Sequence, residues 1–202
     1  MKPEHAVTIV LLAGGRATRL PGKLTRSIGG EPMLVKVFRQ LTATGRPCVI
    51  SVREPLAPEL SRSIPAPTVS DTHADAGPLG GLASAAAHVR TPLLFAAAGD
   101  LPNIDCALID ELERQYRQAA TGAAAPEVVL PRHENGDVEP LAALYDTAAL
   151  RDSAQRCLAL GRKKVTQALE GLRVIHYDIP AERASTFINI NTDADLTGIR
   201  PS

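Results

Sequence analysis

The sequence predicts an α/β fold: a single-domain, three-layer αβα arrangement with a mainly parallel, mixed sheet. The chain has 202 residues, enough for one domain with a large core and short for two, so residues 1–202 are expected to form one unit. Short apolar runs alternate with segments of helical periodicity, as in parallel strands joined by helices. The first run, residues 6–13 (AVTIVLLA), is followed by glycines and is typical of a central strand buried on both faces.

The other elements follow in order along the chain. After Pro32, apolar residues recur at helical spacing until Gly45 ends the run, so a helix is expected there. Cys48–Val52 and Leu93–Ala98 are expected strands, and the alanine-rich segment 79–89 between them is an expected helix. Later segments complete the pattern, with helices expected near residues 108–116, 147–160 and 163–170, strands at 128–130, 141–145 and 173–178, and connectors at 55–67 and 119–125.

Composition narrows the classes of partner and the compartment. The chain carries 22 basic and 22 acidic residues, so its zero net charge favours neither a nucleic acid nor a membrane surface as a partner. The cysteines, Cys48, Cys106 and Cys157, are odd in number and widely spaced, which predicts reduced structural thiols rather than disulfides or a zinc cluster. The first apolar run is too short to span a membrane and has no cleavage signature, so the expected location is the cytoplasm.

A glycine-rich basic loop follows the first strand, with the sequence LAGGRATRLPGK over residues 12–23. Gly14 and Gly15 allow backbone N–H groups to turn toward an anion, and three positive charges come to the same place. These charges belong to Arg16, Arg19 and Lys23. The loop matches neither the dinucleotide-binding fingerprint nor the Walker pattern. It predicts a triphosphate-binding loop, and the alternative is a glycine turn with solvated basic side chains.

An acidic residue, Asp100, follows the expected strand Leu93–Ala98 in the sequence AAAGDLP. Ligands of open α/β sheets bind at the carboxyl ends of the strands, where this side chain is expected. A carboxylate that faces a triphosphate suits Mg²⁺, which prefers one or two carboxylates together with phosphate oxygens. Asp100 is therefore the expected metal ligand, and the alternative is an aspartate that forms a turn.

Two further segments indicate ligand contacts. In residues 71–82 (DTHADAGPLGGL), a glycine-rich turn opens a helix of small residues, which permits close approach of a flat nucleobase. The alternative is tight packing of that helix on the sheet. In residues 187–193 (FININTD), apolar and amide residues alternate, so Asn189 and Asn191 are expected on one face of a strand, with a helix beginning at the following threonine or aspartate. The alternative for the asparagines is local hydrogen bonding in a helical turn.

Taken together and in this order, these segments resemble the molybdenum cofactor guanylyltransferase family, the MobA-like branch of the nucleotidyltransferases. The resemblance covers nearly the whole chain and implies a Rossmann-like fold of the GT-A type. It is carried by LAGGRATRL, PGK, GGEPML, SDTHADAGPLGGL, AAAGDLP, EPLAALY, LGRKKV and FININTDADL. The opening loop alone indicates a nucleotidyltransferase, and GPLGGL and FININT narrow the resemblance to this branch.

The resemblance implies an Mg²⁺-dependent transfer of GMP from GTP to the terminal phosphate of molybdopterin, or of the molybdenum cofactor, with release of pyrophosphate. Arg19, Lys23 and Asp100 are implied as catalytic residues, and Asp100 also as the metal ligand. The implied nucleotide-binding residues are Leu12, Ala13, Gly14, Gly15, Arg16, Arg19, Lys23, Asp71, Gly81 and Asp100. The implied acceptor-binding residues are Arg162, Lys163, Asn189 and Asn191. Transient contact with proteins of molybdoenzyme maturation is also expected.

The chain departs from the family pattern at a few positions. The loop between Arg19 and Lys23 is short and has no acidic residue before the lysine. Arg26 lies in a stretch that is usually apolar, and Ser51 stands where an asparagine near the base is expected. Three alternatives remain open: a cytidylyltransferase for the same cofactor, a nucleotidyltransferase for another small phosphorylated acceptor, and a noncatalytic nucleotide-binding protein that delivers the cofactor.

Overall fold

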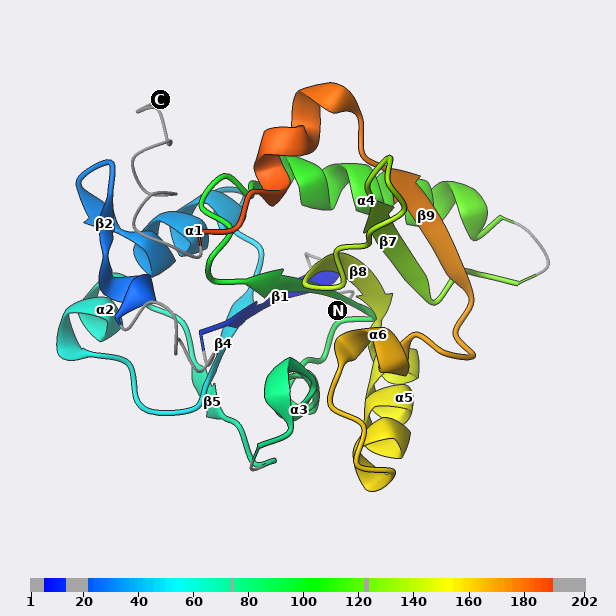
Figure 1. The fold of residues 1–202 in the computed structure, drawn as a ribbon, viewed down its shortest axis with the longest axis horizontal. Coiled ribbons are helices and arrows are strands. Elements are labelled where there is room, and N and C mark those ends of the chain that lie inside the picture. Colours follow the sequence, from blue (N-terminus) through cyan, green and yellow to red (C-terminus); the bar gives the residue numbers. More distant parts are fainter. Residues whose placement is uncertain (1–5, 14–21, 74, 122–123, 191–202) are drawn as a thin grey trace.

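β1 (Val7–Leu12) is the central strand of a seven-stranded sheet in the computed structural model, which describes residues 6–13, 22–73, 75–121 and 124–190 (Figure 1). It pairs in parallel with β4 (Cys48–Val52) on one side and with β6 (Leu93–Ala98) on the other. The remaining strands of this sheet are β5 (Thr68–Ser70), β7 (Val128–Arg132), β8 (Ala142–Asp146) and β9 (Val174–Asp178). Across the sheet the order is β5-β4-β1-β6-β8-β7-β9.

One strand of this sheet, β8, runs against the others. It pairs antiparallel with both β6 and β7, whereas β4 pairs in parallel with β5, and β7 pairs in parallel with β9. Because the chain direction reverses twice between β6 and β7, the carboxyl end of β7 lies at the same edge of the sheet as the ends of β1, β4 and β6. The prediction of a mainly parallel, mixed sheet is confirmed.

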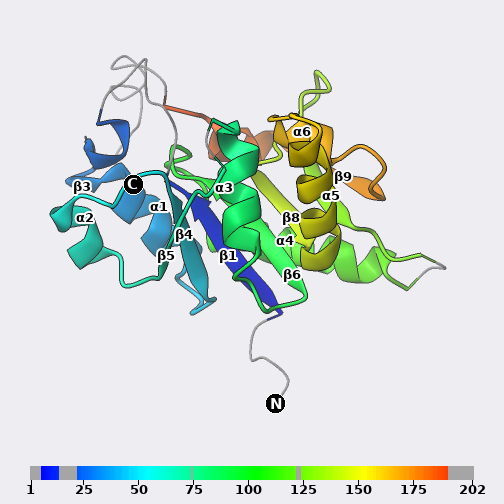
Figure 2. The same ribbon diagram turned by 90° about the horizontal axis from the view of Figure 1, so that it is seen from below.

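Helices cover both faces of the sheet (Figures 1 and 2). On one face lie α1 (Met33–Leu41) and α4 (Cys106–Ala119). On the other lie α3 (Gly77–Ala86), α5 (Thr147–Ala159) and α6 (Val165–Ala168). Two buried hydrophobic clusters result, one between the sheet and the first pair of helices and one between the sheet and the other three. The layers are those of the predicted αβα arrangement.

The central strand is apolar because both of its faces are covered. Ile9 and Leu11 belong to the cluster with α1 and α4, whereas Val10 belongs to the cluster with α3. All three are fully buried, and burial of a side chain of this size stabilises the fold by about 1.5–3 kcal/mol. The one polar side chain of the strand, Thr8, accepts a hydrogen bond from the Thr91 hydroxyl at 2.8 Å, so its burial leaves no unpaired oxygen.

The two helices nearest β1 pack in different ways. α1 is amphipathic and buries Met33, Leu34, Val37 and Leu41, which share one helical face. α3 consists mainly of glycine, alanine and leucine, and its residues 79–86 are all buried. Glycine weakens a helix by about 0.5–1 kcal/mol relative to alanine, so the two adjacent glycines of α3 indicate a need for close packing rather than for helix stability.

Several short elements lie outside the sequence predictions because they are too short to show a hydrophobic period. They are η1 (Lys23–Thr25), β2 (Ser27–Ile28), β3 (Glu31–Pro32), β5 and α2 (Pro58–Ser63). α2 lies inside the segment expected as a connector, and Pro58 stands at its first position, where proline costs no hydrogen bond. α3 begins two residues earlier and ends three residues earlier than predicted, and α6 is shorter than the helix predicted at 163–170.

The strand predicted to contain Asn189 is wrong over its described part. Ala181–Phe187 forms the 3-10 helix η2, and residues 188–190 belong to no strand. Phe187 and Ile190 are buried, whereas Ile188 and Asn189 are exposed, so the apolar residues that matter are three positions apart rather than two. The helix expected after this segment lies outside the described residues.

Two of the cysteines, Cys48 and Cys157, are buried, and Cys106 is half-buried. All three are free thiols. Burial raises the pKa of the Cys48 thiol to about 12, so at neutral pH it stays protonated and unreactive.

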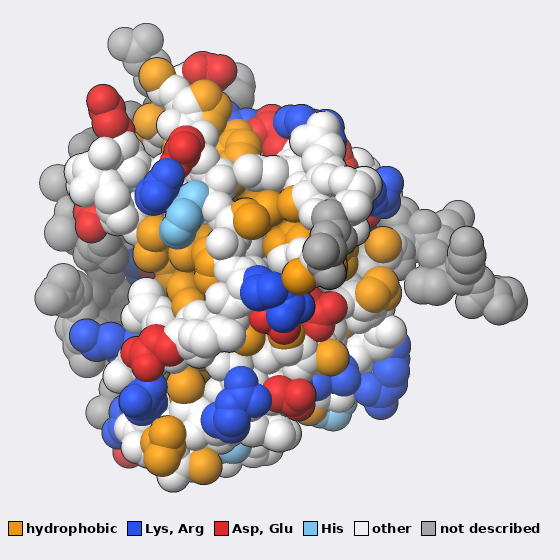
Figure 3. Space-filling view, turned by 90° about the vertical axis from the view of Figure 1, so that its right-hand side faces the viewer, with side chains coloured by type: hydrophobic (Ala, Val, Ile, Leu, Met, Phe, Trp, Pro, Cys, Tyr) orange, Lys and Arg blue, Asp and Glu red, His pale blue; other side chains and the backbone are white. Residues whose placement is uncertain are grey.

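The side of the molecule that carries the edge strand β9 is of mixed character. Figure 3 shows basic and acidic side chains interspersed among hydrophobic ones on this face. Arg132 at the end of β7 pairs with Asp178 at the end of β9, with 2.7 Å between Nη2 and Oδ1.

In the described part of the chain, no helix has the length and apolar character of a membrane span.

Candidate active site

The loops after four parallel strands meet at one edge of the sheet. The backbone N–H of Ala13 donates to Ser51 O at 2.8 Å, and that of Gly99 donates to Leu12 O at 3.0 Å. These bonds tie the first residue after β1 to β4, and the first residue after β6 to the end of β1. Carboxyl ends that meet in this way form the ligand-binding edge of open α/β sheets. Parallel pairing therefore brings together the ends of β1, β4 and β6, where Leu12, Ala13 and Asp100 lie.

Lys23 and Asp100 form an ion pair at this edge, with 2.7 Å between Nζ and Oδ2. Their side chains are 10% and 29% exposed, so the lysine is held inside while the carboxylate can be reached from solvent. Lys23 begins η1 directly after Gly22, whose φ of 69° lies in the left-handed region that favours glycine. The structure thus joins two of the three residues expected to be catalytic, although they lie 77 positions apart in sequence.

Gly99 allows Asp100 to reach the edge. A Cβ atom at residue 99 would lie 2.9 Å from Leu34 Cδ1 and 3.0 Å from Leu12 O, both closer than packed atoms tolerate. The absence of a side chain lets β6 end directly against β1 and α1. The sequence does not reveal this role, since the three contacting residues are far apart along the chain.

The first turns of α3 form a wall of the site beside β1 and β4. Ser51 is 2% exposed, and its hydroxyl donates to Gly81 O at 2.9 Å. A Cβ atom at Gly81 would lie 2.8 Å from Ser51 Oγ and 3.8 Å from Leu12 Cδ2. Ser51, which stands where an asparagine near the base is expected, therefore holds α3 against the sheet and does not face a ligand.

Asp71 lies in the loop that leads from β5 to α3. Its backbone N–H donates to Val52 O at 2.8 Å, and its Oδ1 accepts from the His73 N–H at 2.9 Å. Oδ2 lies 3.9 Å from the position that a Cβ of Gly81 would occupy. The carboxylate therefore lies against the glycine pair of α3, and its role toward a base stays a prediction.

The residues expected on the acceptor side are in different places. Arg162 pairs with Glu170 at 2.5 Å. Lys163 lies against the start of α3, where its carbonyl oxygen would be 3.3 Å from a Cβ of Gly77. Asn189 is exposed, and its neighbour Ile190 donates its N–H to Asp100 O at 3.2 Å. Figure 1 shows α6 and the segment before residue 190 on opposite sides of the sheet. The described acceptor residues thus flank the edge and do not form one cluster.

Five predicted site residues lie outside the described residues. Four belong to the glycine-rich loop and one to the C-terminal segment: Gly14, Gly15, Arg16, Arg19 and Asn191. Their roles stay predictions from the sequence.

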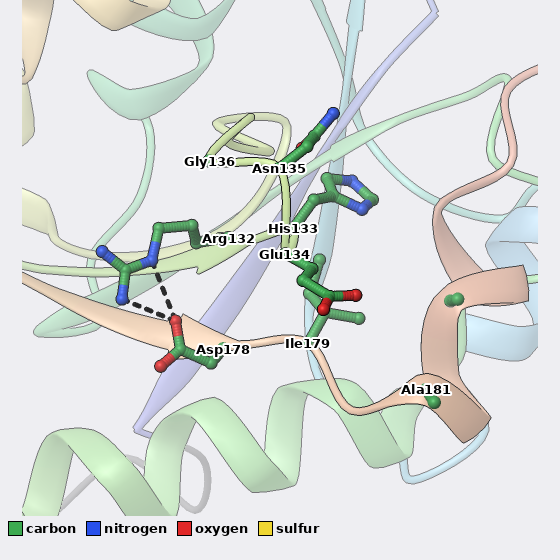
Figure 4. Close-up of a pocket in the computed structure, with 9 residues that line it drawn as sticks. Arg132, His133, Glu134, Asn135, Gly136, Asp178, Ile179 and Ala181 are labelled. Atoms are coloured by element: carbon green, nitrogen blue, oxygen red, sulfur yellow. Dashed lines mark hydrogen bonds and ion pairs between the residues drawn. The ribbon is translucent and has the colours of Figure 1, made fainter.

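A pocket of about 970 Å³ opens at the carboxyl ends of β7 and β9 (Figure 4). Its lining comprises Arg132, His133, Glu134, Asn135, Gly136, Asp178, Ile179, Ala181 and Ala184. The loop between β7 and β8 supplies four of these residues, and the carbonyl oxygen of Leu141 at its end accepts a hydrogen bond from Ala98 N at 2.9 Å. The loop that lines the pocket is therefore bonded to the last residue of β6, two positions before Asp100.

His133 anchors this pocket to the rest of the edge. Its ring meets the Phe187 ring edge-on, with 5.7 Å between centroids, and its Nε2 lies 2.9 Å from Glu139 Oε1. Phe187 stands two residues before Asn189, so the pocket is continuous with the segment that contacts Asp100. The sequence analysis missed these residues, because exposed polar residues in a hairpin loop carry no periodic pattern.

A family model described as the MobA-like NTP transferase domain matches residues 9–174. The chain belongs to the MobA-like NTP transferase family. It is 32% identical to the molybdenum cofactor guanylyltransferase of Ralstonia nicotianae over 97% of each chain. Among solved structures, it is similar to molybdopterin-guanine dinucleotide biosynthesis protein A from Archaeoglobus fulgidus, with a TM-score of 0.77, 25% identity and coverage of 94% of this chain and 95% of that one.

The fold is also similar to that of a cytidylyltransferase from Leptospira borgpetersenii, with a TM-score of 0.73, 17% identity and coverage of 94% of this chain and 83% of that one. At this identity the likeness concerns the fold alone. This MobA-like transferase thus has the predicted Rossmann-like nucleotidyltransferase fold, and its own residues must decide which base and acceptor it takes.

We predict that Gly81→Ala lowers the free energy of unfolding by about 1–2 kcal/mol, because the new methyl carbon overpacks the contact with Ser51 Oγ. The loss should occur although alanine favours a helix over glycine by about 1 kcal/mol. In the double variant Gly81→Ala/Ser51→Ala, most of the stability should return. Urea unfolding of the wild type, both single variants and the double variant measures this coupling. Equal losses with and without the serine hydroxyl would contradict the contact.

Proposed function

We propose that this MobA-like transferase moves GMP from GTP to the terminal phosphate of molybdopterin, or of the molybdenum cofactor, and releases pyrophosphate. The observation that carries the proposal is the position of the Lys23–Asp100 pair between two binding surfaces. The α3 wall with Asp71 lies on one side of the pair, and the pocket at β7 and β9 lies on the other. The similarity to a molybdenum cofactor guanylyltransferase and to a molybdopterin-guanine dinucleotide biosynthesis protein supports the same substrates.

The reaction needs positioning and charge neutralisation more than a covalent intermediate. An oxygen of the acceptor's terminal phosphate attacks the α-phosphorus of GTP in line and forms a new phosphoanhydride bond. The bond from the α-phosphorus to the bridging oxygen breaks, and pyrophosphate leaves with that oxygen. No general base is required, because the attacking phosphate is already an anion.

Lys23 is proposed to neutralise the β- and γ-phosphates, together with Arg19 from the part of the loop outside the described residues. In the structure its ammonium group lies on the Asp100 carboxylate at 2.7 Å, which fixes its position at the edge before any ligand binds. A preorganised charge of this kind stabilises a developing anion without further rearrangement.

Asp100 is proposed to hold Mg²⁺. Its carboxylate is partly exposed just after the end of β6. The described residues contain no group of three or more histidine, cysteine, aspartate or glutamate side chains that could hold a metal. A single carboxylate suits Mg²⁺, which uses one or two carboxylates and completes its shell with water and phosphate oxygens. When bound there, Mg²⁺ would supply positive charge to the phosphate oxygens of the nucleotide.

Asp71 and the backbone around Gly81 are proposed to recognise guanine. A carboxylate accepts hydrogen bonds from the N–H groups on the Watson–Crick edge of guanine, and cytosine lacks that pair of donors. Ser51 is engaged with Gly81 O, so it offers the base nothing in place of the expected asparagine. Discrimination in favour of GTP therefore depends on the aspartate and on backbone groups.

The pterin end of the acceptor is proposed to occupy the pocket lined by His133 and Asp178. The volume of about 970 Å³ falls within the range of small-molecule sites. The lining combines donors and acceptors, as a polar heterocycle requires, and Asn189 stands between this pocket and Asp100. A reaction that consumes GTP favours the cytoplasm, and release of the product calls for transient contact with molybdoenzyme maturation proteins.

The proposed function is tested by supplying molybdopterin with GTP, CTP or ATP and identifying the product by mass spectrometry. A GMP adduct is expected, with kcat/KM for GTP at least about a hundredfold above that for CTP, because CTP leaves buried acceptors unpaired. A CMP adduct would assign the chain to the cytidylyl alternative. Pyrophosphate release with sugar phosphates only would assign the chain another phosphorylated acceptor. Nucleotide binding without turnover on any acceptor would favour the noncatalytic protein that delivers the cofactor.

The role of Asp100 is tested by Asp100→Asn, which should lower turnover by at least about a hundredfold at saturating Mg²⁺. The amide keeps a hydrogen-bond acceptor for Lys23 but removes the charge, so the fold should persist. Asp110→Asn is the matched control, since Asp110 also pairs with a basic side chain, Arg46, at 2.5 Å but lies on α4. Turnover of the Asp100 variant equal to that of the control would remove this residue from the site.

The acceptor pocket is tested by Ala184→Arg, which places a long side chain in the pocket from η2. The KM for molybdopterin should rise at least about tenfold while the KM for GTP stays within about twofold, because the new side chain displaces one ligand only. Ser185→Arg is the control, since Ser185 is the next exposed residue of η2 and does not line the pocket. Equal effects of both variants on the acceptor would place the pterin elsewhere.

A further inference from the structure

The two carboxylate oxygens of Asp71 have different surroundings. Oδ1 accepts a hydrogen bond from the His73 N–H at 2.9 Å and lies 3.5 Å from the Ser84 hydroxyl. Oδ2 has no hydrogen-bond partner among the described residues and lies on the side of Gly81. One oxygen is therefore held by the protein, whereas the other lies beside Gly81 and keeps its capacity to accept a hydrogen bond.

Ser84 fixes this arrangement from inside α3. It is buried, and its Oγ accepts a hydrogen bond from the Thr72 N–H at 3.1 Å and lies 3.1 Å from Thr72 Oγ1. Thr72 follows Asp71 directly, so this contact ties the backbone beside the aspartate to the helix. Together with the hydrogen bond from the His73 N–H to Oδ1, it fixes the two residues that follow Asp71.

The neighbouring glycine makes room for the same carboxylate. A Cβ atom at Gly80 would lie 3.1 Å from Asp71 Oδ1 and 2.8 Å from Ala76 Cβ. Gly80 and Ser84 are four residues apart and thus share one face of α3. On this face, Gly80 leaves space for the Asp71 carboxylate, and the Ser84 hydroxyl contacts the loop that carries it.

Packing of α3 does not itself require a hydroxyl at this position. Residues 79–86 are all buried, and Ser84 is the one member with a polar side chain. Alanine has a higher helix propensity than serine, and the flanking positions 83, 85 and 86 are alanine. The hydroxyl makes its contacts with the Asp71 loop, so its effect is on that loop.

We infer that Ser84 is a positioning residue for base selection, an inference that rests on the proposed transfer of GMP. By tying Thr72 to α3, it holds Asp71 so that Oδ1 stays within the protein and Oδ2 accepts a hydrogen bond from the exocyclic amine of guanine. Selection among purine nucleotides is thereby set by a side chain that does not itself touch the base.

The test compares GTP with inosine triphosphate, which lacks the exocyclic amine, in the wild type, Ser84→Ala and Ser84→Thr. In Ser84→Ala, the KM for GTP should rise about fivefold to tenfold, as expected for one lost hydrogen bond, while kcat stays within about twofold. The KM for inosine triphosphate should change little, so the preference for GTP should fall by about the same factor. Ser84→Thr keeps the hydroxyl and should retain most of the preference.

Ser153→Ala is the matched control. Ser153 is also a buried serine of a helix on the same face of the sheet, and its hydroxyl donates to Ala168 O at 2.6 Å. Its loss should affect stability in urea but leave the ratio of the two KM values unchanged. A stability loss in Ser84→Ala without a change in that ratio would reduce Ser84 to a structural role and overturn the inference.

The wild type distinguishes this failure from failure of the proposed function. A wild type that prefers GTP to both CTP and inosine triphosphate, with an unchanged ratio in Ser84→Ala, overturns the role of Ser84 alone. A wild type that prefers CTP overturns the proposed GMP transfer and the amine contact together. A wild type that uses GTP and inosine triphosphate equally well retains the transfer but overturns the amine contact.

Discussion

Parallel pairing of β1 with both β4 and β6 is the constraint on which the site depends. Because the three strands run in the same direction, the loops that follow them emerge together, and residues from distant parts of the chain become neighbours. The bonds from Ala13 N to Ser51 O and from Gly99 N to Leu12 O extend this pairing beyond the strands. The ion pair between Lys23 and Asp100 is then a local consequence of the topology of the sheet.

Three glycines let neighbouring elements pack closely enough to form the site. Gly99 brings β6 against β1, Gly81 brings α3 against Ser51, and Gly80 leaves space for the Asp71 carboxylate. At each position a single methyl group would meet an atom at about van der Waals contact or closer. The glycines of α3 weaken the helix itself, and the packing that they permit offsets this cost. Stability and geometry of the site therefore depend on the same contacts.

The sequence predicts the main strands, the longer helices and the edge that binds ligands, because each is encoded by local periodicity or by a short motif. It misses contacts between distant residues, so the roles of Gly99 and Ser84 come only from the structure. The alternation of apolar and amide residues near Asn189 misleads, since Phe187 and Ile190 are the buried pair. The sequence also gives no sign of the pocket at His133, because its lining combines residues of a hairpin loop with residues far along the chain and has no repeating pattern.

The antiparallel strand β8 divides the sheet into two sets of parallel strands, whose carboxyl ends lie at the same edge. β5, β4, β1 and β6 carry the residues proposed to bind the nucleotide, whereas β7 and β9 carry the pocket proposed for the acceptor, and β8 lies between the two sets in the sheet. Changes in the loops of β7 and β9 can therefore alter the pocket while the nucleotide side keeps its strand register. Within such an architecture, selection can exchange one acceptor for another without rebuilding the machinery that activates the nucleotide.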